Sequence, residues 1–366
     1  MKYINEYRNP VIIEKLVEKI HAEATGHYRF MEVCGSHTHA IRKYGIQSLL
    51  PRNIELLSGP GCPVCVTPQS FIDHLVQLSC ESGVIITSYG DLLRVPGTNA
   101  SLSGCREEGR DIRIIYSSME ALQMAISESG KQVVFAAIGF ETTAPSTAVV
   151  IREARKKHLK NFKVLSAHKV MPPAMKAIIR EGVKLNGYIC PGHVSAVTGS
   201  KIYDIFPERF KVATVISGFE PVDILLSILM LIRQVNTGNY RTEIQYKRAV
   251  KSSGNPVALK LMRDVFEEAD TIWRGLGELP DSGLCIKEKY EKIDAMRFFS
   301  MKPPAVSENP ACICGEILKG TKKPVDCSLF GKACTPGKPV GACMVSPEGS
   351  CNAWIRWREL EETSQE

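Results

Sequence analysis

The sequence lacks any apolar stretch long enough to cross a membrane. Its longest apolar run, Ile224 to Ile232, is interrupted by Ser227 and is far shorter than the roughly 20 residues of a spanning helix. The opening residues, Met1 to Arg8, contain neither an apolar core nor a small-residue cleavage site, which are the marks of a secretory signal. We therefore expect a cytoplasmic protein that does not enter a membrane.

A concentrated block of charge is absent as well. The chain has 46 Lys and Arg residues against 39 Asp and Glu residues, and the basic residues are scattered rather than gathered in one stripe. Nucleic-acid binding, which needs a basic patch, is therefore not expected. Neither a Walker P-loop nor a GxGxxG fingerprint occurs, so no pattern supports nucleotide binding.

The 366 residues are enough for two or three domains, at about 100–200 residues each. Between residues 28 and 218, short β-rich runs recur with helical patterns between them, a spacing typical of βαβ units and parallel sheets. The runs are Tyr28–Val33, Ile54–Leu57, Val84–Thr87, Ile112–Tyr116, Gln132–Ile138, Phe162–Leu165, Gly187–Ile189 and Phe210–Ile216. We therefore expect an α/β protein.

Eight such strands fit either one (β/α)₈ barrel or two four-stranded sheets side by side. Two Gly-Phe-Glu sequences, at 139–141 and 218–220, each follow a strand, and this weak repeat favours two Rossmann-like domains. We expect these domains at 1–120 and 121–235. A small, loop-rich C-terminal iron–sulfur domain with helices is expected at 236–366, and an N-terminal helix is expected to pack on it.

Helix start signals occur at two places. Thr67-Pro68 and Asn255-Pro256 each pair a capping side chain with a proline, as is typical of helix N-termini. After Asn255, apolar residues recur at helical spacing as far as Leu276 and include Trp273. We expect one helix there, with its apolar residues in the core rather than around a cofactor.

Cysteine is abundant, with thirteen residues. Cytosolic thiols stay reduced, so clustered cysteines in such a chain indicate metal binding or redox chemistry rather than disulfides. Six of them fall in a proline- and glycine-rich stretch that cannot hold itself together by burial alone. They are Cys312, Cys314, Cys327, Cys334, Cys343 and Cys351.

The spacing of these six cysteines does not match the paired C-x₂-C knuckles of structural zinc. An iron–sulfur cluster tolerates such spacing because it can collect four thiolates from separate loops. Cys343 lies in an apolar run and is expected to be a buried thiol that behaves as a small hydrophobe. With zinc and unligated thiols as the alternatives, the expected cluster ligands are Cys327, Cys334, Cys351 and one of Cys312 or Cys314.

A second cysteine site is Cys62-Pro63-Val64-Cys65, between a predicted strand and a predicted helix. A C-x-x-C ahead of a helix N-terminus lowers a thiol pKa and permits a reversible disulfide. We therefore expect a redox role for Cys62 and Cys65. The alternative is half of a zinc site, but no partner pair is evident nearby.

The third site is Cys34-Gly35-Ser36-His37-Thr38-His39, directly after the first predicted strand. Loops at the carboxyl ends of parallel strands form the ligand crevice of such sheets, so Cys34, His37 and His39 are expected to meet Cys62 and Cys65 in one crevice. A thiolate beside a histidine suits covalent catalysis or a soft transition metal. The alternative for Cys34 is a buried structural thiol.

Gly139 to Pro145 also follows a predicted strand and opens a helix. Hydroxyls and amides at a helix start form an anion nest, and Glu141 is a candidate buried acid or base. Together with Cys34, Cys62, Cys65 and His37, it completes the candidate catalytic residues. His193, alone at another strand end, is more typical of a core histidine than of a ligand.

Several unusual stretches between residues 34 and 351 are shared with one known family. They are Cys34–Thr38, Gly59–Cys65, Thr87–Asp91, Gly139–Pro145, Cys190–His193 and Glu348–Cys351. On these stretches the chain resembles the HypD family of [NiFe]-hydrogenase maturation factors. The resemblance implies a scaffold on which an Fe(CN)₂CO group is assembled in complex with HypC, with cyanide delivered by HypE, rather than a freely turning-over enzyme.

The resemblance also implies two Rossmann-like domains and a third that carries a [4Fe–4S] cluster. Carried over by motif, Cys34 holds the iron, shared with a cysteine of HypC. Cys62 and Cys65 form the thiol pair that exchanges electrons with the cluster. Two other readings of the residues stay open: a stand-alone disulfide reductase resembling ferredoxin–thioredoxin reductase, and a structural zinc protein.

Overall fold

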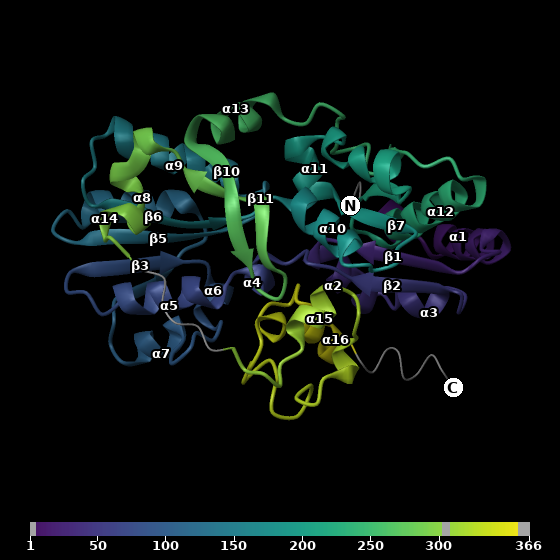
Figure 1. Ribbon diagram of the computed structural model, residues 1–366, viewed down its shortest axis with the longest axis horizontal. Helices are drawn as coiled ribbons and strands as arrows, with labels where there is room; N and C mark the ends of the chain where they lie inside the picture. Colours follow the sequence, from purple (N-terminus) through teal and green to yellow (C-terminus); the bar gives the residue numbers. More distant parts are fainter. Residues whose placement is uncertain (1–4, 302–307, 358–366) are drawn as a thin grey trace.

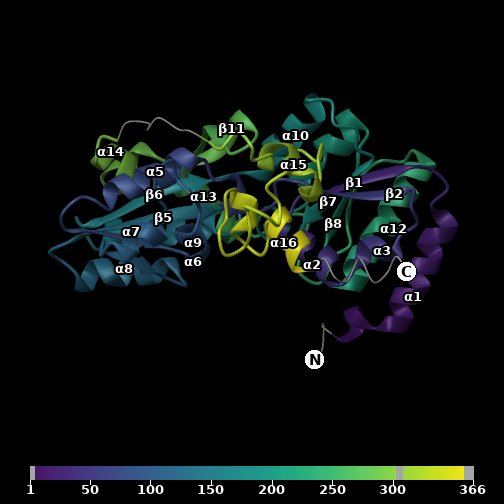
Figure 2. The same cartoon turned by 90° about the horizontal axis from the view of Figure 1, so that it is seen from below.

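Two parallel β-sheets lie side by side in the computed structural model, which describes residues 5–301 and 308–357 (Figure 1). Helices cover both sheets, and a cysteine-rich region lies against the junction between them (Figures 1 and 2). All eight predicted strands are present, and the predicted α/β class is confirmed. The single-barrel alternative is wrong, because the strands divide between two separate sheets.

The first sheet has five parallel strands, and the second has four. In spatial order, the first sheet contains β2 (Ile54–Ser58), β1 (Tyr28–Glu32), β7 (Gly187–Pro191), β8 (Ala213–Ser217) and β9 (Thr242–Ile244). The second contains β4 (Ile112–Ile114), β3 (Val84–Ser88), β5 (Gln132–Gly139) and β6 (Phe162–His168). The interior strands β3, β7 and β8 are buried along their whole length, which explains their continuous apolar sequences.

From β1 to β9, the chain crosses between the sheets twice. It forms β1 and β2, leaves to build the whole second sheet from β3 to β6, and returns to complete the first sheet with β7, β8 and β9. The expected boundary at residue 120 therefore falls inside the second sheet, between β4 and β5. Strand pairing, rather than order along the sequence, sets the division between the sheets. β7 inserts between β1 and β8, with Phe30 opposite Gly187.

Helices pack on both faces of each sheet. Around the first sheet these include α1 (Pro10–Glu23), α2 (Gly35–Lys43), α3 (Ile46–Leu49), α10 (Met171–Arg180), α11 (Gly192–Thr198) and α12 (Pro221–Thr237). Around the second sheet they include α4 (Pro63–Val66), α5 (Gln69–Leu78), α6 (Gly90–Leu93), α7 (Leu102–Glu107), α8 (Ser118–Ser127), α9 (Ala144–Lys156) and α14 (Ala295–Phe298). No helix among the described residues is long and apolar enough to cross a membrane.

The N-terminal helix α1 packs on α12, whereas it was expected to pack on the C-terminal region. Asn9 caps α1 by accepting a hydrogen bond from the Val11 amide at 3.0 Å. Ile20 of α1 is fully buried in the core of the first sheet, and Glu23 forms an ion pair with Arg233 of α12 at 2.6 Å. Burial of this apolar face fixes the position of α1.

The predicted helix after Asn255 is only partly correct. Asn255 caps α13 (Pro256–Val265), but the chain then forms an antiparallel hairpin of β10 (Phe266–Trp273) and β11 (Gly277–Ile286). Gly275 and Gly277 adopt positive φ of 78° and 77° at the turn, a conformation that favours glycine. Trp273 is buried as expected, and its indole N–H donates to Ser282 Oγ at 2.9 Å.

The C-terminal region is poor in regular structure, as expected. Within residues 308–357 it contains α15 (Cys314–Leu318) and α16 (Ser350–Arg356), joined by loops and the short 3₁₀ turns η5 (Pro324–Asp326) and η6 (Ala342–Met344). We call residues 311–357 the cysteine-rich region. It packs α16 against α2 and η6 against α4, so it contacts the helices that follow β1 and β2.

Candidate functional site

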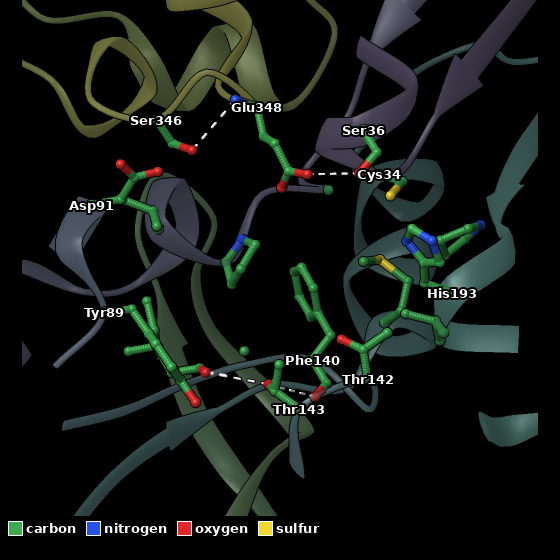
Figure 3. A pocket seen from close by; sticks show the side chains of 18 of the residues that line it. Cys34, Ser36, Tyr89, Asp91, Phe140, Thr142, Thr143, His193, Ser346 and Glu348 are labelled. Atoms are coloured by element: carbon green, nitrogen blue, oxygen red, sulfur yellow. Dashed lines mark hydrogen bonds between the residues drawn. The ribbon is translucent and has the colours of Figure 1, made fainter. Parts of the chain in front are cut away.

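The carboxyl ends of strands from both sheets face one crevice of about 660 Å³ (Figure 3). Cys34 follows β1, Tyr89 follows β3, Phe140 follows β5 and His193 follows β7. The cysteine-rich region forms the remaining wall with Ser346, Pro347 and Glu348. The crevice is therefore built by three parts of the chain, at the edge where parallel sheets place their ligand sites.

Cys34 stands at the N-cap of α2 with extended backbone geometry and lines this crevice half-buried. Burial, and then the negative charge of Glu348, raise the pKa of the Cys34 thiol to about 12. Glu348 is held beside it because its carboxylate accepts a hydrogen bond from Ser36 Oγ at 2.6 Å. Cys34 is thus a protonated thiol at neutral pH, and a metal that binds it must displace a proton.

The loop before Cys62 lies directly on Cys34. A Cβ at Gly61 would come within 2.1 Å of the Cys34 amide nitrogen, and the Gly35 amide donates to the Gly61 carbonyl at 3.0 Å. The predicted convergence of the loops after β1 and β2 is therefore present. It depends on a glycine at position 61, where no side chain fits.

Gly61→Ala should displace Cys34, because the added methyl group would overlap its backbone. We expect destabilisation of about 1–3 kcal/mol, the range for overpacking in a well-packed interior. Denaturant unfolding measures the change in free energy, and the labelling rate of Cys34 reports its displacement. Gly83→Ala is the control, because a Cβ there meets nothing within 4 Å although its φ of +75° adds backbone strain. Equal labelling of Cys34 in the parent and Gly61→Ala would contradict the expectation.

Cys62 and Cys65 lie behind the crevice wall, both buried and both free thiols. Gly61, Pro63 and Val64 separate them from the cavity. Burial raises the pKa of Cys65 well above its ordinary value, contrary to the expected lowering by a helix N-terminus. The reason is that α4 has only four residues, so it offers little dipole against full burial.

A second cavity, small and largely closed, is lined by thiols of the cysteine-rich region. Its apolar walls include Ile317, Leu329 and Phe330. We call it the cysteine cavity, and its thiols are Cys312, Cys314, Cys327, Cys334 and Cys351.

These thiols fit an iron–sulfur cluster by donor type and number. Gly341 leaves room at the cavity, since a Cβ there would lie 2.6 Å from the sulfurs of both Cys312 and Cys314. Both members of this pair line the cavity, so the choice between them as the expected fourth ligand stays open. Among the described residues, no group of three or more His, Cys, Asp and Glu side chains is arranged to hold a single metal ion.

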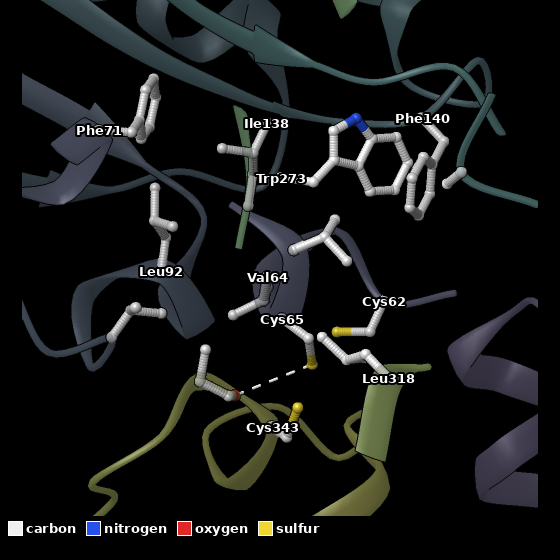
Figure 4. Close-up of a cluster of buried hydrophobic side chains, with 14 of the residues drawn as sticks. Cys62, Val64, Cys65, Phe71, Leu92, Ile138, Phe140, Trp273, Leu318 and Cys343 are labelled. Atoms are coloured by element: carbon white, nitrogen blue, oxygen red, sulfur yellow. Dashed lines mark hydrogen bonds between the residues drawn. The ribbon is translucent and has the colours of Figure 1, made fainter. Parts of the chain in front are cut away.

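Cys343 joins the two thiol sites. It is fully buried, and Figure 4 shows its sulfur near that of Cys65. It interacts with the thiols of both Cys65 and Cys314. The Cys65 thiol also points at the carbonyl of Ala342, 3.9 Å away. These thiol contacts lower the pKa of Cys343 to about 6. The local sequence predicts only a small hydrophobe at this position, because nothing near residue 343 indicates its neighbours in space.

His37 and His39 lie outside the Cys34 crevice, which corrects the expectation that these two histidines converge there. His37 is buried with its Nε2 2.9 Å from the Gly218 carbonyl, and burial lowers its pKa to about 4. His39 contacts the Pro347 carbonyl at 3.3 Å. Spacing along α2 does not explain this, since a residue three after Cys34 shares its face. The contacts of the two rings with the Gly218 and Pro347 carbonyls show that the docking of α2 sets their directions.

Glu141 is buried as expected but faces a different cavity. One carboxylate oxygen accepts the Met171 amide at 3.1 Å, while the other has no partner within the described residues. Burial raises its pKa to about 7. Its neighbours Phe140, Thr142 and Thr143 do line the Cys34 crevice, so the predicted anion nest faces it without the carboxylate.

Two crevice residues were not assigned from the sequence. His193 is exposed in the crevice rather than buried in the core, and its ring stacks on Phe219 at 4.1 Å. His37 stacks on the other side of Phe219 at 4.6 Å. Glu348 belongs to a distant segment, so only its placement beside Cys34 reveals it. Phe219, on which both histidine rings stack, was indicated in the sequence only by the repeated Gly-Phe-Glu.

A thiol in an inter-sheet crevice, a buried cysteine pair behind it and a separate thiol-lined cavity define a class of α/β protein equipped for thiol and metal chemistry. The family model for HypD, described as the hydrogenase formation hypA family, matches residues 11–358. The chain belongs to this family of hydrogenase maturation factors.

Curated relatives agree along nearly their whole length. The hydrogenase maturation factor HypD2 of Bradyrhizobium diazoefficiens is 49% identical over 364 residues, covering 96% of each chain. HypD of Azotobacter vinelandii is 48% identical, covering 98% of this chain and 97% of its own. HypD of Rhizobium leguminosarum bv. viciae is 45% identical, covering 100% of this chain and 98% of its own. The resemblance inferred from the motifs is confirmed.

Proposed function

We propose that this protein is the cytoplasmic scaffold on which the Fe(CN)₂CO group of a [NiFe]-hydrogenase is assembled, in complex with HypC and with cyanide delivered by HypE. The observation that carries the proposal is the position of Cys34, the one thiol that lines the inter-sheet crevice within the described residues. Iron that carries cyanide and carbon monoxide is soft, and thiolate is a fitting ligand for it. Iron is cargo here rather than a resident cofactor.

The crevice residues suit this task. Tyr89, Phe140 and Met171 give it apolar walls, which limit access of water to a bound metal. Ser36, Glu348 and His193 are polar side chains drawn around Cys34 in Figure 3. Burial, followed by the charge of Glu348, raises the pKa of Cys34 and keeps it protonated, and a cation on the sulfur would reverse that preference. A docked small partner would close the open side.

The cysteine cavity is proposed to hold a [4Fe–4S] cluster through Cys327, Cys334, Cys351 and one of Cys312 or Cys314. When bound, such a cluster supplies or accepts one electron at a time. Cys343 then lies between this cavity and Cys65, and Cys62 and Cys65 form the thiol pair nearest the crevice. The contacts of Cys343 support the proposal that the two thiol sites communicate.

Anaerobic purification followed by metal and sulfide analysis tests this proposal first. We expect about four iron and four sulfide equivalents per chain in the absence of the partners, as a Cys₄-ligated cube requires. One zinc in place of iron would eliminate both the scaffold and the disulfide reductase. The alternative is a disulfide reductase with Cys62 and Cys65 as its catalytic pair. Such a reductase would keep its activity without Cys34, and this distinguishes it from the scaffold.

A further inference from the structure

A larger cavity, of about 950 Å³, lies against β2, the edge strand of the first sheet. We call it the basic groove. Four positive charges line it against the single negative charge of Glu55, and they come from Arg29, Arg42, Arg52 and Lys323. Neither the Cys34 crevice nor the cysteine cavity shares a residue with it.

The groove is built to present these charges. Glu55 pairs with both Arg29 Nε at 2.9 Å and Lys323 Nζ at 3.2 Å, which holds two cations with one carboxylate. The guanidinium carbon of Arg42 lies 3.5 Å from the ring centre of Trp354, an arrangement that orients a cation by its attraction to the ring. Arg52 is exposed and forms no ion pair within the described part of the chain.

The cysteine-rich region supplies one wall of the groove. Lys323 immediately precedes η5, which ends next to Cys327, and Trp354 lies on α16 one turn after Cys351. Residues three apart on a helix are neighbours, and both cysteines line the cysteine cavity. Figures 1 and 2 both show α16 beside α2, the helix that carries Arg42. The groove therefore lies immediately behind the cysteine cavity.

Positive charge alone does not distinguish the basic groove from the other cavities of the protein. A second basic cavity, of about 660 Å³, lies between α9 and the 3₁₀ segment Glu288–Ile293 and carries five cations against two acids, so both cavities have a net charge of +3. Figure 1 shows α9 and α14 at the far end of the second sheet, away from the cysteine-rich region. What singles out the basic groove is its position beside the thiols, and the other cavity serves as a matched control.

We propose that the basic groove docks an acidic one-electron carrier protein that delivers electrons to the cysteine-rich region. The inference rests on the proposed function, because it takes the cysteine cavity to hold a one-electron centre. Each encounter oxidises the carrier by one electron and reduces this region by one, and no atom is transferred. Two encounters, with uptake of two protons, suffice to reduce a Cys62–Cys65 disulfide to two thiols.

Charge complementarity suits this kind of encounter. Electron-transfer partners meet over small interfaces, below about 1,200 Å² in total, so that they can separate quickly after the electron has moved. Opposite charges then raise the association rate without a large apolar contact area.

Binding of an acidic plant-type [2Fe–2S] ferredoxin, used as the probe carrier, tests the proposal. Calorimetry on the anaerobically purified full chain measures Kd whether or not the cluster is loaded. We expect Arg52→Glu with Lys323→Glu to weaken binding roughly tenfold or more, as loss of steering charges does. Arg52→Lys with Lys323→Arg, and the control Lys160→Glu with Lys292→Glu, should leave Kd unchanged at low salt.

A second readout is the rate at which reduced ferredoxin changes the visible absorbance of the loaded protein. We expect this rate to fall in the groove variant, while reduction by dithionite, which needs no docking, is unchanged and shows that the variant is folded. Absence of ferredoxin binding to the parent, equal binding by the groove variant, or an equal loss in the control variant would overturn the proposal. A chain without iron and sulfide would overturn the proposed function instead.

Discussion

Cys34→Ala is expected to abolish the infrared bands of iron-bound carbonyl and cyanide in the protein co-purified with HypC. No other thiol among the described residues lines the crevice, so the variant leaves no sulfur to anchor the iron there. The iron and sulfide content proposed for the cysteine cavity should be unchanged, because Cys34 is not among the cavity's lining residues. Infrared spectroscopy under anaerobic conditions measures the first effect, and metal analysis the second.

Cys80→Ala is the matched control for that experiment, because Cys80 is an exposed free thiol at the end of α5 and lines none of these cavities. It should retain the bands in full. Persistence of the bands in Cys34→Ala would show that the iron is anchored elsewhere. A disulfide reductase would keep its activity in Cys34→Ala and lose it in Cys65→Ala, the opposite of the behaviour expected of the scaffold.

Cys327→Ala is expected to cause the largest structural change, with loss of the cluster and unfolding of the cysteine-rich region. That region has few helical residues and packs its loops around the thiols, so we expect binding of the proposed cluster to be coupled to folding. Limited proteolysis should cut it within residues 311–357 while the two sheets stay intact. Iron content should fall to near zero in the same sample.

Cys285→Ala provides the comparison for Cys327→Ala, since Cys285 is exposed on β11 and distant in sequence from the cysteine-rich region. It should match the parent in protease resistance and iron content. If Cys327→Ala were as resistant as Cys285→Ala, the order of the region would come from packing rather than from the metal. Cys343→Ala tests the link between the two thiol sites. We expect this variant to retain the proposed cluster but to lose electron exchange between the cluster and Cys65.

The strands were predictable because burial on both faces of a parallel sheet demands continuous apolar sequence, and runs such as Val84–Ser88 meet that demand locally. The hairpin after α13 was not predictable in this way. Apolar residues from Leu261 to Leu276 follow a helical spacing, yet the chain turns at Gly275 and Gly277 and pairs β10 with β11. Cross-strand pairing with the segment that follows the turn outweighed the helical period.

The candidate site shows the same division. Cys34 and the Cys62–Cys65 pair were found from strand ends, because a parallel topology sends every strand's carboxyl end to one edge. His37 was misplaced, since the direction of a side chain on α2 depends on how that helix is docked. Glu348 and Cys343 come from the far end of the sequence, and no local pattern connects either of them to Cys34 or Cys65.

The sequence by itself determined the α/β class, the strands, the family and the thiols that carry the chemistry, because each of these depends on residue type and local spacing. The tertiary structure alone decided that β7 returns to the first sheet and that Cys343 lies between Cys65 and Cys314. It also decided that Lys323 and Arg52 share a groove. These are contacts between distant segments, and their free energy comes from burial and pairing that exist only once the chain has folded.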